Sequence, residues 1–226
     1  MFSGKDYYDV LNSFNLKNVK GVVIDDRFDD LDEEKRETFM NNLKQCENLT
    51  YLKIDCEEIE YIPGNLNNLE DLIIEKGPKI KEIPKNLPKL RYLSIFFDMM
   101  KIMNEEENDL KEIPESLTNL KVLDLYYTLN KIKIPNTVEN LKLDNCPNIE
   151  IDNLTNLKIL NINNPDLVNL PDTLINLNYL YVDMCSNLKD IPETLINLKE
   201  LHIRGCGNIT IPNNIRNLPN IVIEQI

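Results

Sequence analysis

One pattern recurs along almost the whole chain: a leucine or similar apolar residue, any residue, then an isoleucine or similar apolar residue. It occurs ten times, and successive copies lie 30, 20, 21, 30, 18, 19, 20, 21 and 20 residues apart. A period of about twenty residues is typical of stacked-repeat proteins, because one such unit cannot bury its own apolar face without a neighbour. The copies begin at Val22, Leu52, Leu72, Leu93, Leu123, Leu141, Leu160, Leu180, Leu201 and Ile221.

Each copy predicts one short β-strand. Alternation with a period of two places the two apolar side chains on one face of a strand. All units run the same way, so the strands are expected to stack in parallel, about 4.8 Å apart. The return path has about six to eight residues, which suits extended or 3₁₀ backbone better than an ordinary helix. Proline, which donates no hydrogen bond, recurs there, at Pro63, Pro84, Pro114, Pro135, Pro171, Pro192 and Pro212.

These units resemble leucine-rich repeats, L-x-x-L-x-L-x-x-N/C-x-L, from about Val19 to Ile226. The short Ile/Leu-Pro unit is similar to that of bacterial leucine-rich-repeat effectors, whereas the Cys-x-x-Leu turn resembles plant resistance proteins and cysteine-containing repeats, so the subclass stays open. The resemblance implies a curved solenoid that binds proteins on its concave sheet. Two clear matches are Leu198-x-x-Leu201-x-Ile203-x-x-Cys206-x-x-Ile209 and Leu177-x-x-Leu180-x-Val182-x-x-Cys185-x-x-Leu188.

We therefore expect one α/β domain over residues 1–226: a leucine-rich repeat solenoid with a curved parallel sheet of about ten strands. Its convex side is expected to be extended or 3₁₀, and short helices are expected near the N-terminus. Residues 1–18 predict a helical cap that shields the first strand, and residues 19–226 carry about ten repeats. The apolar face of the cap is predicted at Tyr8, Val10, Leu11 and Phe14.

Two units are longer than the others, at residues 25–48 and 96–113. The first is acidic and predicts a helix from Asp29 or Asp30 to about Cys46. We interpret its charge run as a solvated helix face, with docking of a basic partner as the alternative. Its buried side is predicted at Leu31, Phe39, Met40 and Leu43.

The second long unit is unusually apolar for a loop. Two interpretations stay open: these side chains fold back onto the solenoid as a short helical turn, or they contact a partner. The residues concerned are Phe96, Phe97, Met99, Met100, Ile102 and Met103.

Composition limits the classes of partner. A net charge of −13 speaks against binding to nucleic acid or to an anionic membrane and favours a basic protein. No apolar run reaches 18 residues, and the first residues lack the apolar stretch of a signal peptide. We expect a cytoplasmic protein, with export into a host by a route without a cleaved signal peptide as an open alternative.

The five cysteines are odd in number and fall at repeat turns, which predicts reduced structural thiols. The resemblance implies that they point inward and donate to backbone carbonyls. A disulfide between Cys185 and Cys206 is geometrically conceivable but is not expected. No metal site is expected, because the chain has no Cys-x-x-Cys and His202 is its only histidine. Phosphate-binding, G-x-S-x-G and H-E-x-x-H motifs are missing from the sequence, so we expect no enzyme and no cofactor.

If the Leu-x-Ile side chains face the core, the residues beside them lie on the opposite sheet face, in three columns. The column after the isoleucine is mostly acidic, and the aromatic residues fall into two groups, as in protein interfaces. The predicted function is a non-enzymatic protein-interaction module, with a bacterial or pathogen effector as one form of it. The alternative is a scaffold that self-associates through the last strand. The candidate partner-binding residues are Tyr92, Phe96, Tyr126, Tyr179, Tyr181, Asp183, His202 and Arg204.

Overall fold

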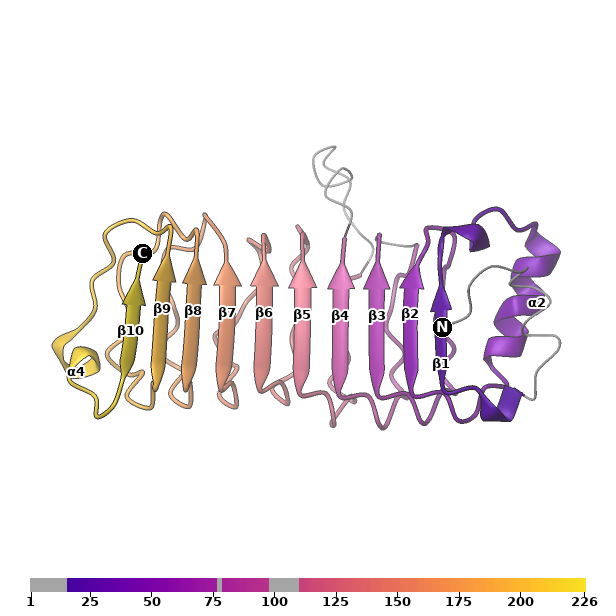
Figure 1. The fold of residues 1–226 in the computed structure, drawn as a ribbon, viewed down its shortest axis with the longest axis horizontal. Helices are drawn as coiled ribbons and strands as arrows, with labels where there is room; N and C mark the ends of the chain where they lie inside the picture. The colour runs from indigo at the N-terminus through magenta and orange to yellow at the C-terminus, as the bar shows by residue number, and fades with distance from the viewer. Residues whose placement is uncertain (1–15, 77–78, 98–109) are drawn as a thin grey trace.

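The computed structural model describes residues 16–76, 79–97 and 110–226. Ten parallel strands form one sheet, and their order in the sheet is their order in the chain (Figure 1). The strands are β1 (Gly21–Ile24), β2 (Tyr51–Asp55), β3 (Asp71–Glu75), β4 (Tyr92–Phe96), β5 (Val122–Tyr126), β6 (Asn140–Asp144), β7 (Ile159–Asn163), β8 (Tyr179–Asp183), β9 (Glu200–Arg204) and β10 (Val222–Gln225). The described helical segments are η1 (Leu16–Asn18), η2 (Asp26–Phe28), α2 (Glu33–Leu43) and α4 (Asn213–Arg216).

The strand register follows the apolar alternation. In β2, for example, Leu52 and Ile54 are buried, while Tyr51, Lys53 and Asp55 are partly exposed. From β1 to β9, successive strands pair residues of the same apolar column, so a Leu, Ile or Val side chain always lies beside another Leu, Ile or Val. The predicted alignment is confirmed from β1 to β9, through the ladder Val22, Leu52, Leu72, Leu93, Leu123, Leu141, Leu160, Leu180 and Leu201.

The predicted alignment of the last strand is wrong by two residues. Ile223, rather than Ile221, pairs with Leu201, and Gln225 pairs with Ile203. The preceding return contains the short helix α4. A helix advances 1.5 Å per residue and an extended chain more than 3 Å, so a helical return uses more residues to cover the same distance. Strand β10 therefore starts later than the repeat pattern predicts.

One continuous core runs between the sheet and the return segments, from Ile24 to Ile215. Apart from the returns that contain α2 and α4, the described returns are built from turns and extended backbone, and the described 3₁₀ segments are η1 and η2. Two isolated parallel bridges connect neighbouring returns, Glu112 with Lys133 and Asp190 with Thr210. The sheet and the returns thus enclose the apolar side chains that one twenty-residue unit could not bury alone.

The first long unit contains the expected helix, but α2 begins at Glu33 rather than near Asp29. Its N-cap is Asp32, whose carboxylate accepts a hydrogen bond of 2.9 Å from the amide of Lys35. Leu31 precedes the helix and is partly buried against the core. The predicted buried side is otherwise confirmed at Phe39, Met40 and Leu43.

Several predictions concern residues outside the described ranges. They are the cap residues Tyr8, Val10, Leu11 and Phe14, and the insertion residues Met99, Met100, Ile102 and Met103. Of the insertion's two phenylalanines, Phe97 is buried, whereas Phe96 is exposed.

The inward thiols that the resemblance implies are confirmed at the turns of Cys146 and Cys185, whereas Cys46 follows helix α2 and Cys206 is only partly buried. Cys185 is fully buried, and its thiol donates to the carbonyls of Asp183 (3.3 Å) and Ile162 (3.6 Å). Cys146 makes the equivalent contacts in its own repeat. The amide of Cys185 donates to Sγ of Cys206 at 3.3 Å, so the two thiols lie in neighbouring turns, and both are free rather than joined in a disulfide.

Candidate binding surface

We use the name open face for the sheet face that points away from the core and was predicted to be concave. Its strand residues are partly exposed, as the columns predict. One outward residue, Ser94, is instead buried, with 8% of its surface exposed. Its hydroxymethyl group is shorter than the side chains of Ile73 and Asp124, which flank it in register.

The first aromatic group lies at the ends of β4 and β5, and we call Phe96, Tyr126 and Tyr127 the central aromatic cluster. The ring centroids of Phe96 and Tyr126 are 5.6 Å apart, and those of Phe96 and Tyr127 are 5.2 Å apart in a T-shaped arrangement. The ammonium of Lys142 lies 4.8 Å from the centroid of Tyr126. Phe96 remains 37% exposed. The cluster is a connected aromatic platform with a cation at its edge.

Tyr92 belongs to the same region, but its side chain is held within the sheet face. Its hydroxyl donates to Oδ2 of Asp124 at 2.9 Å. Burial raises the pKa of Tyr92 to about 12, and burial likewise raises the pKa of Asp124. The phenol therefore remains a neutral donor at physiological pH. Its hydrogen bond holds the Tyr92 side chain against the sheet, next to the central aromatic cluster.

Sequence reasoning did not single out Tyr127, which adopts a left-handed backbone conformation with φ of 54°. The residue directly after a strand takes the same conformation at Lys76, Asn145, Met184 and Gly205, of which asparagine and glycine tolerate it best. Tyrosine tolerates it less well, so the contact between Tyr127 and Phe96 is built on a strained position. No sequence signal marked it, because this turn position holds Lys76 and Met184 as well as Asn145 and Gly205 in other repeats.

The second group spans β8, β9 and β10, and we call Tyr181, Glu200, His202 and Glu224 the C-terminal cluster. The ring of Tyr181 stacks on that of His202, with centroids 4.7 Å apart and planes 18° apart. Nδ1 of His202 lies 2.9 Å from Oε2 of Glu224. Nε2 of the same ring lies 3.3 Å from Oε2 of Glu200, which also accepts from the Tyr181 hydroxyl at 3.3 Å.

The remaining predicted residues lie beside this cluster. Tyr179 is on the same face and pairs in register with Glu200. Asp183 pairs in register with Arg204 at the strand ends, but no ion pair between them is present in the described chain. Oδ1 of Asp183 is shielded from solvent and accepts no hydrogen bond. The two groups of predicted residues stay separate, because β6 and β7 lie between them, and β5 and β8 are about 14 Å apart.

The acidic column is largely neutralised at the N-terminal end of the sheet. Glu75 pairs with Lys53 at 2.7 Å, and Asp55 pairs with Lys76 at 3.1 Å. The hydrogen bond that Lys53 donates to Glu75 raises the pKa of Lys53. These carboxylates therefore present less net charge to a partner than the sequence column indicates.

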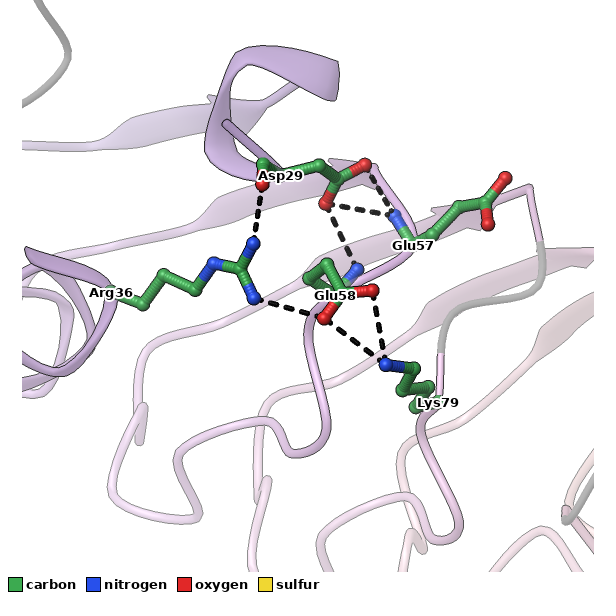
Figure 2. Close-up of polar contacts among 5 residues, drawn as sticks. All are labelled: Asp29, Arg36, Glu57, Glu58 and Lys79. Carbon is green, nitrogen blue, oxygen red and sulfur yellow. Dashed lines mark hydrogen bonds and ion pairs between the residues drawn. The ribbon is translucent and has the colours of Figure 1, made fainter. Parts of the chain in front are cut away.

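Part of the acidic run in the first long unit has a structural role (Figure 2). The carboxylate of Asp29 accepts from the amide of Glu57 (3.0 and 3.2 Å) and from that of Glu58 (2.9 Å). The carboxylate of Glu58 accepts a hydrogen bond of 2.9 Å from Arg36 and two of 3.0 and 3.1 Å from the ammonium of Lys79. Arg36 also donates to the backbone carbonyl of Asp29. This network ties the unit that carries α2 to the next two repeats.

A row of asparagines, which sequence reasoning also missed, joins neighbouring repeats just before the strands. Each side-chain amide donates to a backbone carbonyl about one repeat earlier, as Asn176 does to Thr155 at 2.8 Å. The signal was the dipeptide Asn-Leu, which recurs at the first apolar position of many units. The same contact is made by Asn48, Asn68, Asn119, Asn156 and Asn197.

His202 lies on the open face, whereas the thiol of Cys206 donates to the carbonyls of Val182 and Arg204 in the turn, so the two do not form a pair. Within residues 16–76, 79–97 and 110–226, no three His, Cys, Asp or Glu side chains are placed to hold a metal ion. In the same part of the chain, no helix combines the length and apolarity needed to cross a membrane.

Comparison with known proteins gives structural likeness only, since no family model and no curated protein matches the chain. The leucine-rich repeat domain of the type III effector XopL is 24% identical with a TM-score of 0.50, over 81% of this chain and 62% of that one. InlP of Listeria monocytogenes is 19% identical with a TM-score of 0.53, over 91% of this chain and 55% of that one. This chain thus spans less than two thirds of the length of either. Its repeat pattern and its solenoid of ten parallel strands show that the chain has the leucine-rich repeat fold.

Proposed function

We propose that this chain is a non-enzymatic module that binds a protein partner on its open face. The observation that carries the proposal is the central aromatic cluster, in which Phe96 is exposed while its ring packs against Tyr126 and Tyr127. Aromatic side chains on a rigid surface bury a large area with little loss of conformational entropy, as interface hot spots do. The fold it shares with the domain of a type III effector supports an effector as one form of this function.

The partner in this proposal is a basic protein. The net charge of −13 attracts cations over the whole surface and disfavours nucleic acid and anionic membranes. We propose that the interaction takes place in the cytoplasm, either of the producing cell or of a host cell that the protein enters.

Affinity capture with matched variants tests the proposal. The double variant Phe96→Ala/Tyr126→Ala removes the exposed ring and its neighbour, and the control Ile175→Ala/Ile196→Ala removes two exposed apolar side chains from return segments. A partner captured by the wild type should bind the first variant at least 30-fold more weakly, on the order of 2 kcal/mol, and the control unchanged. Circular dichroism shows whether each variant is folded. Equal binding to all three folded proteins would refute the open face as the binding surface.

The alternative function is a scaffold that self-associates through β10. This strand is the last in the sheet, and Val222 and Ile226 are 47% and 87% exposed. Unpaired strand edges favour pairing with another chain. Light scattering after size-exclusion chromatography distinguishes the alternatives: a scaffold gives a mass that rises with concentration and falls in Val222→Lys, whereas a monomer at micromolar concentration excludes it.

A further inference from the structure

The C-terminal cluster has more acceptor oxygens than donors. Glu200 and Glu224 together carry four carboxylate oxygens, and the contacts to the hydroxyl of Tyr181 and to the ring of His202 all use the two Oε2 atoms. Both Oε1 atoms accept no hydrogen bond from the described chain. A neutral imidazole donates through one nitrogen only, so in that form one of its two carboxylate contacts lacks a proton.

The same cluster has an excess of negative charge. Its two carboxylates face at most one positive charge, that of a protonated His202 ring, so the cluster is anionic in either protonation state. Arg204 does not compensate, because it lies four residues along β9 from Glu200, about 13 Å in an extended strand, and is exposed without an ion pair to either carboxylate. Tyr179, directly opposite Glu200, adds a second phenol but no charge.

This arrangement differs from that of three other open-face carboxylates, Glu75, Asp55 and Asp124. Glu75 and Asp55 are neutralised by lysines, and Asp124 is partly buried and accepts from Tyr92. The C-terminal cluster instead combines two incompletely bonded carboxylates with stacked aromatic rings. We propose that Glu200, Glu224 and Tyr181 form a binding site for an arginine side chain of the protein partner. The inference rests on the proposed function and specifies the chemistry of the partner.

The guanidinium group matches each part of the site. It is planar, carries five N–H donors and pairs with carboxylates through two parallel hydrogen bonds. A guanidinium group is attracted to an aromatic ring such as that of Tyr181, one face of which is already stacked on His202. Lysine offers a compact charge with three donors and no planar face, so it satisfies fewer of these features. The arrangement therefore favours arginine over lysine.

The single histidine of the chain provides the assay. The ring resonances of His202 can be followed without ambiguity by NMR, at fixed pH and ionic strength, while N-acetyl-arginine amide is added. We expect a saturable shift in the millimolar range. N-acetyl-lysine amide should bind at least threefold more weakly, and the uncharged isostere N-acetyl-citrulline amide should give no saturable shift.

Variants separate the site from general attraction by an acidic protein. Glu200→Gln/Glu224→Gln keeps the side-chain shapes and removes both charges, and it should weaken arginine amide binding at least tenfold. The matched control Glu75→Gln removes one charge from the same face and should leave binding within twofold. The proposal is wrong if citrulline amide binds like arginine amide, if the double variant binds normally, if the control loses as much, or if no saturation occurs by 100 mM.

A second experiment measures how the protein partner captured by the wild type binds to the same variants. Loss of its binding in Glu200→Gln/Glu224→Gln, with the variant folded, supports an arginine anchor. If the partner still binds this variant but is lost with Phe96→Ala/Tyr126→Ala, the arginine proposal fails while open-face binding stands. If neither variant affects the partner, the proposed function itself fails.

Discussion

Replacing Asp29 by alanine should loosen the junction between the first long unit and the next repeat. The carboxylate accepts from two backbone amides, those of Glu57 and Glu58, at 2.9 to 3.2 Å (Figure 2). The contact of Arg36 with this residue uses the backbone carbonyl, so the substitution leaves it in place. The ion pair between Arg36 and Glu58 also remains.

The size of the effect follows from how these amides are placed. Hydrogen bonds to a charged acceptor contribute about 1.5 to 3 kcal/mol each when the donor has no other partner. Glu57 is exposed and Glu58 partly exposed, so water can reach the released amides. We therefore expect about 1 kcal/mol for each amide and about 2 kcal/mol in total. Asp29→Asn, which keeps one neutral acceptor oxygen, should lose about half of that.

Amide hydrogen exchange is the suitable assay, because a repeat protein can open at one end while the rest stays folded. A loss of about 2 kcal/mol corresponds to about 30-fold faster exchange at Glu57 and Glu58. The neighbouring Asp30 is exposed and its side chain makes no hydrogen bond or ion pair in the described part of the chain, so Asp30→Ala is the matched control. Exchange at both amides within threefold of the wild type, or an equal effect of the control, would refute the reasoning.

Three further predictions concern stability. Burial raises the pKa of the thiol to about 12 for Cys56 and to about 11 for Cys146 and Cys185. The free energy of unfolding should therefore be greatest below pH 9 and should fall as the pH rises from 9 to about 12, because the unfolded chain loses these protons first. Urea titrations should show a smaller fall in variants with alanine at these cysteines. Gly205→Ala should lower the free energy of unfolding by about 1 kcal/mol, because φ of this residue is 59°. An added Cβ would also lie 2.6 Å from Sδ of Met184, but this flexible side chain can move. The additional substitution Met184→Ala should therefore not restore the lost stability. Asn176→Ala should cost about 1 kcal/mol in thermal unfolding, through the lost bond to Thr155, whereas Asn169→Ala, at an exposed residue without such a bond, should cost less than half of that.

The placement of most candidate residues could be predicted, because the open face is the complement of the apolar columns. Tyr181 and His202 occupy the same column of adjacent repeats, and the structure stacks them. Glu224 could not be placed in this way. The predicted alignment put it at a strand end, whereas the two-residue shift of β10 brings it beside His202. A four-residue helix in the last return thus decides the composition of the C-terminal cluster.

The sequence by itself determined the number of strands, their parallel order and the register of β1 to β9, because alternating apolar residues at a twenty-residue period can be buried in only one way. The tertiary structure alone decided which polar groups meet across repeats. Asp29 bonds to amides 28 and 29 residues away, and the partner of each open-face carboxylate depends on side-chain reach between strands. Such contacts depend on angles and distances of a few ångströms, which a repeat pattern does not encode.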